Sequence, residues 1–184
     1  MFTTRLISIR SARRACDRWH SHHAPPVGGL FAIGTFAGAR LVCVGVVGRP
    51  VARALDYKTV AEVTRLASDG SSHGAASATL RACVAEAFAR GFRRLVSYTL
   101  LGERGACYRM AGWHPVLLTR GNRQWSTPSR RRVSAQQPGR KIRWEIGPDA
   151  APYSREVSKA LWRAVGKVPI PTRSSSQLEL SEVA

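Results

Sequence analysis

Acidic residues are scarce in this chain. Its 184 residues include 11 aspartates and glutamates against 29 lysines and arginines, which gives a formal net charge of +18. The 4 cysteines are widely spaced, without a CxxC pair, so they are expected as small core residues of a cytoplasmic protein. The longest clean apolar run, residues 41–48, is far shorter than the roughly 20 residues that cross a bilayer, so no membrane association is expected.

Arginine supplies 25 of the 29 basic residues. The planar, forked guanidinium suits phosphate, which predicts a nucleic acid as partner, with DNA favoured; codon bias is the other explanation for the arginine excess. The stretch 104–144 holds ten basic residues and no acidic one, with Trp113, Trp125 and Trp144 among them. It is predicted to contact phosphates and to stack on an extruded base, a solvated basic loop being the alternative. The basic residues assigned to nucleic-acid contact are Arg120, Arg123, Arg130, Arg131, Arg132, Arg140, Lys141 and Arg143.

Hydrophobic periodicity divides the chain into strands and helices. A first strand near Ile7 precedes a helix that Ser11 caps, and the strongest helical stripe covers residues 76–88. Further strands are expected at residues 30–36, 41–47, 59–67, 95–100, 113–119 and 141–146. The order strand, loop, helix, strand predicts a parallel pair within an α/β (α+β) domain over residues 1–146. Residues 147–184 are predicted to be a partly disordered tail with one short helix.

A loop of serine and glycine precedes the strongest helix. The N-terminus of a helix presents unpaired amides and the positive end of its dipole, and glycines allow a ligand to approach the backbone. The loop is therefore a candidate phosphate cradle, with an ordinary capped helix start as the alternative. The residues assigned to cofactor binding are Gly70, Ser71, Ser72, His73, Gly74, Ala75, Ala76 and Ser77.

This loop and a second motif around Tyr108 resemble the GNAT acyltransferase superfamily. The family's loop pattern is Arg/Gln-x-x-Gly-x-Gly/Ala; Gly74 and Ala76 match it, whereas Ser71 stands where Arg or Gln is usual. The second family motif is a tyrosine four residues before a glycine–aromatic pair, here Tyr108 followed by residues 112–113. An asparagine that family members often carry one to two turns before this tyrosine is absent.

The resemblance covers residues 7–119 and implies a mixed, mostly antiparallel sheet with a central parallel strand pair and flanking helices. It also implies that the loop amides hold the pyrophosphate of acetyl-CoA or another acyl donor. The pantetheine arm would then enter between the splayed parallel strands, and Tyr108 would protonate the leaving thiolate. The serine at position 71 weakens the expected grip on the pyrophosphate and leaves the donor open.

Acyl transfer to an amine also needs a base. Glu62, on the strand that enters the loop, is the candidate base, and an ordinary exposed strand residue is the alternative. Arg65 is a candidate substrate or phosphate contact, but period-two alternation places it on the face opposite to Glu62. Both residues face one site only if a β-bulge intervenes, and the family resemblance implies a bulge there.

Within the superfamily the chain looks closest to the phage-borne branch that includes the Mom-type DNA-modification proteins. Residues 19–25, 64–66 and 105–113 carry this likeness. It implies an acyltransferase-fold enzyme that modifies a nucleobase amine in DNA, in the host cytoplasm if a phage encodes it. Two alternatives stay open: an acetyl-CoA-dependent N-acetyltransferase of a protein or small-molecule amine, and a non-catalytic nucleic-acid-binding protein.

A histidine cluster precedes the first pair of prolines. His20, His22 and His23 are assigned to substrate contact, with a surface cluster as the alternative. Three imidazoles could hold a divalent metal, but the sequence offers no further ligands at a usual spacing. No metal site is therefore predicted.

Overall fold

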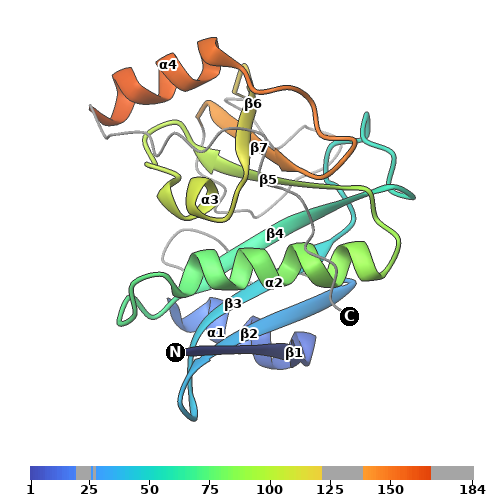
Figure 1. The fold of residues 1–184 in the computed structure, drawn as a ribbon, viewed down its shortest axis with the longest axis vertical. Coiled ribbons are helices and arrows are strands. Elements are labelled where there is room, and N and C mark those ends of the chain that lie inside the picture. Colours follow the sequence, from blue (N-terminus) through green and yellow to red (C-terminus); the bar gives the residue numbers. More distant parts are fainter. Residues whose placement is uncertain (20–25, 27, 122–138, 167–184) are drawn as a thin grey trace, which may run out of the picture.

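The computed structural model describes residues 1–19, 26, 28–121 and 139–166. A single seven-stranded sheet runs through it in the order β1-β2-β3-β4-β5-β7-β6 (Figure 1). The strands are β1 (Phe2–Ile7), β2 (Phe31–Ala37), β3 (Arg40–Gly48), β4 (Val60–Ser68), β5 (Arg94–Leu100), β6 (His114–Leu118) and β7 (Lys141–Ile146). The helices are α1 (Ile9–Trp19), α2 (Ala75–Ala89), α3 (Ala106–Met110) and α4 (Arg155–Val165).

Every pair of neighbouring strands is antiparallel except β4 and β5. Their parallel ladder ends where Val63 pairs with Ser97. Both strands continue beyond this point without pairing to each other, so they diverge (Figure 1). The predicted mixed, mostly antiparallel sheet with a central parallel pair and flanking helices is thus confirmed.

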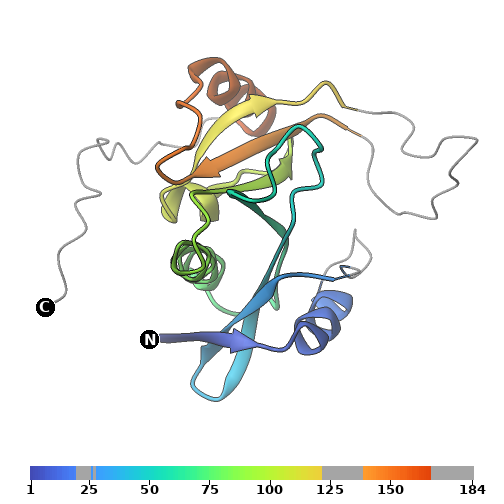
Figure 2. The ribbon, with the colours of Figure 1, turned by 90° about the vertical axis from the view of Figure 1, so that its right-hand side faces the viewer.

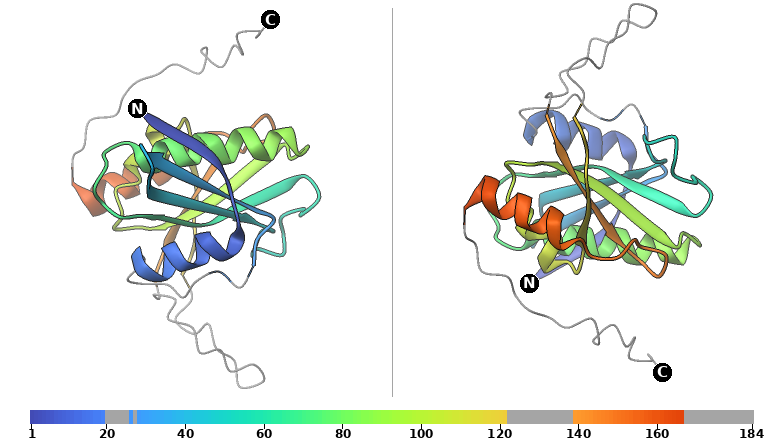
Figure 3. Two further views of the ribbon diagram at one scale, coloured as in Figure 1. Left: turned by 90° about the horizontal axis from the view of Figure 1, so that it is seen from below. Right: turned by 90° about the horizontal axis from the view of Figure 1, so that it is seen from above.

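Helices cover both faces of the sheet. The two longest helices within the first 120 residues, α1 and α2, lie on opposite faces of the sheet (Figures 2 and 3). Leu80, Cys83 and Ala87 of α2 are fully buried against the strands, as their helical spacing predicts. Val157 and Leu161 of α4 are buried in the same cluster, so α4 packs onto the domain predicted for residues 1–146.

The start of each of two helices has a structural cause. Helix α1 begins at Ile9, because the hydroxyl of Ser8, not that of Ser11, accepts the first-turn amide, at 3.1 Å. Helix α3 begins directly after Gly105, whose φ of +58° suits glycine and whose missing Cβ leaves room for the ring of Trp144. Among the residues that the structure describes, no helix is long and apolar enough to span a membrane.

Candidate functional site

A β-bulge in β4 organises the site. The register with β3 shifts by one residue after Val63, which leaves Thr64 without a partner of its own. The bulge interrupts the alternation of side chains, so Glu62 and Arg65 face the same side of the sheet. Burial lowers the pKa of Arg65, and Glu62 and Cys16 of α1 oppose that shift, which places both groups near the guanidinium. The condition under which Glu62 and Arg65 serve one site is therefore met.

Glu62 is a buried carboxylate, not an exposed strand residue. Its side chain is 6% exposed, and its Oε2 accepts the backbone amide of Val51 at 2.8 Å. Burial raises the pKa of Glu62 to about 7, against the opposing effects of the Val51 amide, Lys141 and Arg65. At neutral pH this carboxyl group exchanges protons readily, which is the property that a general base needs.

Tyr108 lies on the other face of the same strand pair. Its ring stacks on Trp144, with centroids 5.4 Å apart, and its Oη lies 2.8 Å from Oγ of Ser97. Ser97 donates its only hydroxyl hydrogen to the carbonyl oxygen of Val63, at 3.0 Å. Tyr108 must therefore be the donor to Ser97. Burial raises the pKa of Tyr108 above its usual value, so the phenol stays protonated but is a weaker acid than a solvent-exposed tyrosine.

The base and acid candidates meet at one point of the sheet. Glu62 directly precedes Val63, and Tyr108 reaches Val63 through Ser97. The pair Val63–Ser97 is also the last rung of the parallel ladder. A group inserted where β4 and β5 diverge would thus have Glu62 on one face and the Tyr108–Ser97 hydroxyls on the other.

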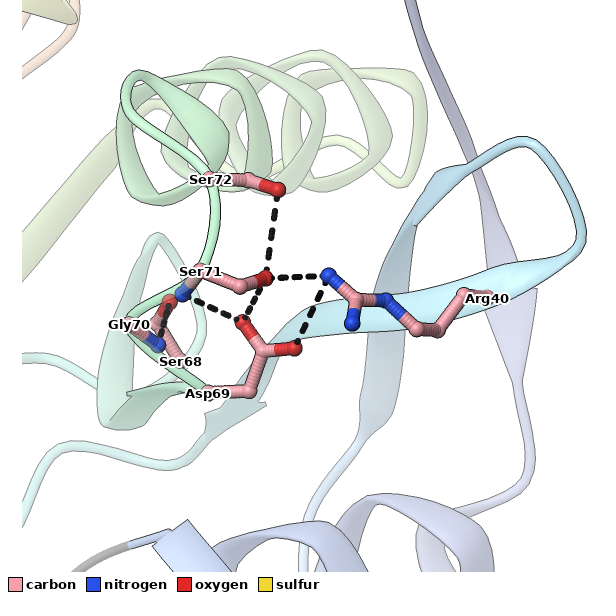
Figure 4. A network of polar contacts seen from close by, with 6 residues as sticks. All are labelled: Arg40, Ser68, Asp69, Gly70, Ser71 and Ser72. Atoms are coloured by element: carbon pink, nitrogen blue, oxygen red, sulfur yellow. Dashed lines mark hydrogen bonds and ion pairs between the residues drawn. The ribbon is translucent and has the colours of Figure 1, made fainter.

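The loop between β4 and α2 contains a carboxylate of its own. Oδ1 of Asp69 accepts the amide of Ser71 at 2.9 Å and the hydroxyl of Ser71 at 2.7 Å (Figure 4). Arg40, the first residue of β3, donates to the hydroxyl of Ser71 and lies 3.7 Å from Asp69. Arg40 therefore brings a guanidinium to position 71, where the family pattern has Arg or Gln.

The rest of the predicted cradle forms the end of the loop and the first turn of α2. Gly74 has a φ of +83°, which favours glycine, and it directly precedes the helix. Ala76 and Ser77 lie in the first turn, where a helix has no internal acceptor, and no residue of the described ranges accepts their amides. The hydroxyl of Ser77 is committed to the carbonyl of Gly74, at 2.9 Å, so only its amide is open to a ligand.

Two of the predicted nucleic-acid contacts lie on the same face of the sheet as Glu62. Lys141 and Arg143 alternate along β7 with Ile142 and Trp144, which are buried in the cluster under α2, so the two cations point to the face of Glu62. Arg120 and Arg140 are exposed. The predicted contacts that fall outside the described residues are His20, His22, His23, Arg123, Arg130, Arg131 and Arg132. No group of three metal-ligating side chains occurs in the part of the chain that the structure describes.

Three residues of this site escaped the sequence-based prediction. Ser97 is a buried polar residue within an apolar strand, and that interruption was the only signal for it. Tyr98, the neighbour of Ser97, points to the same face as Glu62. Burial and the charge of Glu62 raise the pKa of Tyr98. Arg40 is 31 positions from Ser71, and no local pattern connects the two residues.

Several solved structures of acetyltransferases align with this chain. The ribosomal-protein-S18-alanine N-acetyltransferase from Escherichia coli aligns with a TM-score of 0.55 and 15% identity, over 83% of this chain and 97% of that one. An acetyltransferase from Bacillus subtilis in complex with CoA aligns with a TM-score of 0.51 and 10% identity, over 80% of this chain and 99% of that one. A variant of agmatine N-acetyltransferase aligns with a TM-score of 0.55 and 7% identity, over 80% of this chain and 100% of that one.

No protein-family model matches the sequence, and no curated protein matches it either. The structural likeness extends over nearly the whole length of each neighbour. This chain therefore has the fold of the GNAT acetyltransferases.

Proposed function

We propose that this protein is an acyl-CoA-dependent N-acyltransferase. The observation that carries the proposal is the position of Glu62, a buried carboxyl group with a pKa of about 7, beside the point where β4 and β5 diverge. The amide of Val51 donates to Glu62 and orients the carboxyl group. Its raised pKa lets it take up and release a proton near neutral pH, as a general base must.

The residues at the start of α2 fit the pyrophosphate of an acyl-CoA. The open amides of Ala76 and Ser77 supply donors, and the helix dipole favours an anion there. Asp69 would repel a phosphate, but Arg40 lies against it and offsets its charge. The hydroxyl of Ser71, bonded to Arg40 and Asp69, lies at the same loop (Figure 4).

The chain's own groups divide the proton transfers between the two faces of the sheet. Acyl-CoA supplies an activated thioester. Glu62 accepts a proton from the attacking amine nitrogen and passes it to solvent. The raised pKa of Tyr108 disfavours complete loss of its proton. Tyr108 would therefore turn its hydroxyl hydrogen from Ser97 to the departing sulfur and stabilise the negative charge there by hydrogen bonding, while Ser97 keeps its bond to Val63.

The test is an acyl-transfer assay with acetyl-CoA and a panel of amines. The release of free thiol and the mass of the product are its two readouts. The proposal expects thiol release that depends on the amine and an acceptor heavier by one acetyl group. Absence of transfer, combined with absence of CoA binding, would contradict it.

A nucleobase amine in DNA is the finer candidate for the acceptor. It is supported by the net charge of +18 and by Lys141 and Arg143 on the face of Glu62. Mass spectrometry of nucleosides from cells that express the protein would detect such a modification. Replacing Arg130, Arg131 and Arg132 by Gln should lower the slope of log affinity for duplex DNA against log salt by about 2 to 3. An unchanged slope would exclude these arginines from phosphate contact.

The alternatives differ in their behaviour towards CoA and DNA. Acetylation of a protein or small-molecule amine, as the names of two structural neighbours state for those proteins, requires CoA binding and no modified nucleosides. A non-catalytic nucleic-acid-binding protein would bind DNA tightly and show no thermal shift with CoA. CoA binding and the detection of modified nucleosides, measured together, therefore separate all three functions.

A further inference from the structure

The face of the sheet around Glu62 is rich in cations. The register aligns Glu62 of β4 with Val96 of β5, and Val96 with Glu145 of β7. Two residues further along β5, Tyr98 aligns with Arg143 of β7. Residues at matching positions of neighbouring strands share a face, and strands lie about 4.8 Å apart, so β7 is about 10 Å from β4.

Glu145 does not neutralise this face. It is fully buried, and its carboxylate lies 2.9 Å from Nε of Arg143 and 3.5 Å from a terminal nitrogen of Arg94. The backbone amide of Ala151 also donates to it, at 2.7 Å. Two arginines thus share one carboxylate, and the group as a whole stays positive.

Two further cations face Glu62 itself. Lys141 and Arg65 both oppose the rise of its pKa, which shows that their charges are felt at the carboxylate. Lys141 forms no ion pair with any residue in the described ranges, and it is partly exposed. On the described strands β4, β5 and β7, this face therefore carries four cations, Arg65, Arg94, Lys141 and Arg143, against the two carboxylates Glu62 and Glu145.

We propose that the acceptor is an amine borne on an anionic molecule, with its nitrogen at Glu62 and its phosphate or carboxylate at Lys141 and Arg143. This inference rests on the proposed acyltransferase function and names the substrate class of that site. An anionic group forms charge-assisted hydrogen bonds with the two side chains. Arg143, fixed by the buried Glu145, is the oriented donor, and Lys141 is the adaptable one.

The same cations assist the chemistry at the nitrogen. An amine attacks only in its neutral form, and nearby positive charges lower the pKa of a bound ammonium group. A cationic face thus promotes deprotonation by Glu62. It also disfavours polyamines and lysine-rich peptides, whose additional positive charges have no carboxylate to meet.

Three acceptors of equal chain length and different charge test the inference: aminopentyl phosphate, aminopentanol and diaminopentane. With the full-length protein and acetyl-CoA, kcat/KM for the phosphate should exceed that for the alcohol by about tenfold to a hundredfold, the range for one charge-assisted contact. The diamine should be the poorest of the three. A single-stranded oligonucleotide forms a parallel arm, since its phosphates offer the same anionic chemistry. Transfer to the aminoalkyl phosphate alone assigns a small molecule, and transfer to a base assigns nucleic acid.

Lys141→Gln should lower kcat/KM for the phosphate far more than kcat/KM for aminopentanol, and so remove most of the preference for the phosphate. Lys159→Gln, the same substitution at an exposed position of α4, is the matched control and should keep the preference. Arg143→Gln should act like Lys141→Gln, but it also removes a partner of a buried carboxylate, so Lys141 carries the test. Equal or greater activity on the alcohol or the diamine would overturn the anionic acceptor and leave the acyltransferase standing. No transfer to any amine would overturn both.

Discussion

Replacing Glu62 by Gln tests the base directly. The amide is nearly isosteric and can still accept the amide of Val51, but it cannot take a proton. Loss of a general base lowers the rate by about 10² to 10⁴. In the wild-type protein, kcat/KM should rise with pH and level off above about 7, the pH at which Glu62 loses its proton. The Gln variant should lack this rise.

The same substitution has a predictable effect on stability. Burial raises the pKa of Glu62 from 4.5 to about 7, so between these values the folded chain holds a proton that the unfolded chain has lost. Stability from this group therefore falls as the pH rises through that window, and holding the carboxylate ionised above pH 7 costs about 3 kcal/mol. The pKa of about 7 already includes the opposing effects of the Val51 amide, Lys141 and Arg65, each of which lowers the pKa of Glu62. Glu62→Gln should thus gain stability relative to wild type at pH 8 and gain little at pH 4.5.

Two assays check the prediction: pH-dependent steady-state kinetics of acyl transfer, and thermal unfolding at both pH values. Glu156→Gln, at an exposed position in the first turn of α4, is the matched control; it should leave the kinetics unchanged and lower the Tm only slightly, through the lost interaction with the helix dipole. A Glu62→Gln variant with wild-type kcat/KM and the wild-type pH profile would refute Glu62 as the base. A lower Tm at pH 8 would refute the account of its burial.

Three further substitutions test other parts of the site. Tyr108→Phe removes only the hydroxyl and should lower kcat by about 10² to 10³ with little change in KM, and an unchanged kcat in steady-state kinetics would show that another group stabilises the departing sulfur. Arg40→Gln leaves Asp69 uncompensated and should raise the Kd for CoA about fivefold to tenfold in calorimetric titrations; an unchanged Kd would remove Arg40 from the cradle. Gly105→Ala forces a Cβ into the ring of Trp144 at a positive φ and should lower the free energy of unfolding by about 2 to 4 kcal/mol in urea titrations, whereas a loss below about 0.5 kcal/mol would show that the ring can move.

The sequence predicted the features that depend on local patterns. Helix α2 follows from the spacing of its apolar residues, and β7 has the predicted bounds Lys141–Ile146. The parallel pair follows from the order of elements, because a strand, a helix and a second strand in one sheet favour a crossover. The motif around Tyr108 marked a residue that the structure brings to the end of the parallel ladder.

Contacts between distant segments could not be predicted in this way. The bulge at Thr64 reverses the alternation of β4, and period-two reasoning alone assigned Arg65 to the wrong face. The contact between Arg40 and Ser71 depends on how a hairpin and a loop meet in space. The pKa of Glu62 is set by burial, which depends on the whole domain. Each of these features needs tertiary structure, and each changes the chemistry of the site.

The central claim is that an acyl-CoA binds with its pyrophosphate at the first turn of α2. Calorimetric titration of CoA into the wild-type protein and into Gly74→Glu tests it most directly, since the new carboxylate would lie among amides that await an anion. We expect saturable binding to the wild type and none to a variant whose circular dichroism spectrum remains native. Equal CoA affinity in the two folded proteins, or no binding to the wild type, would contradict it.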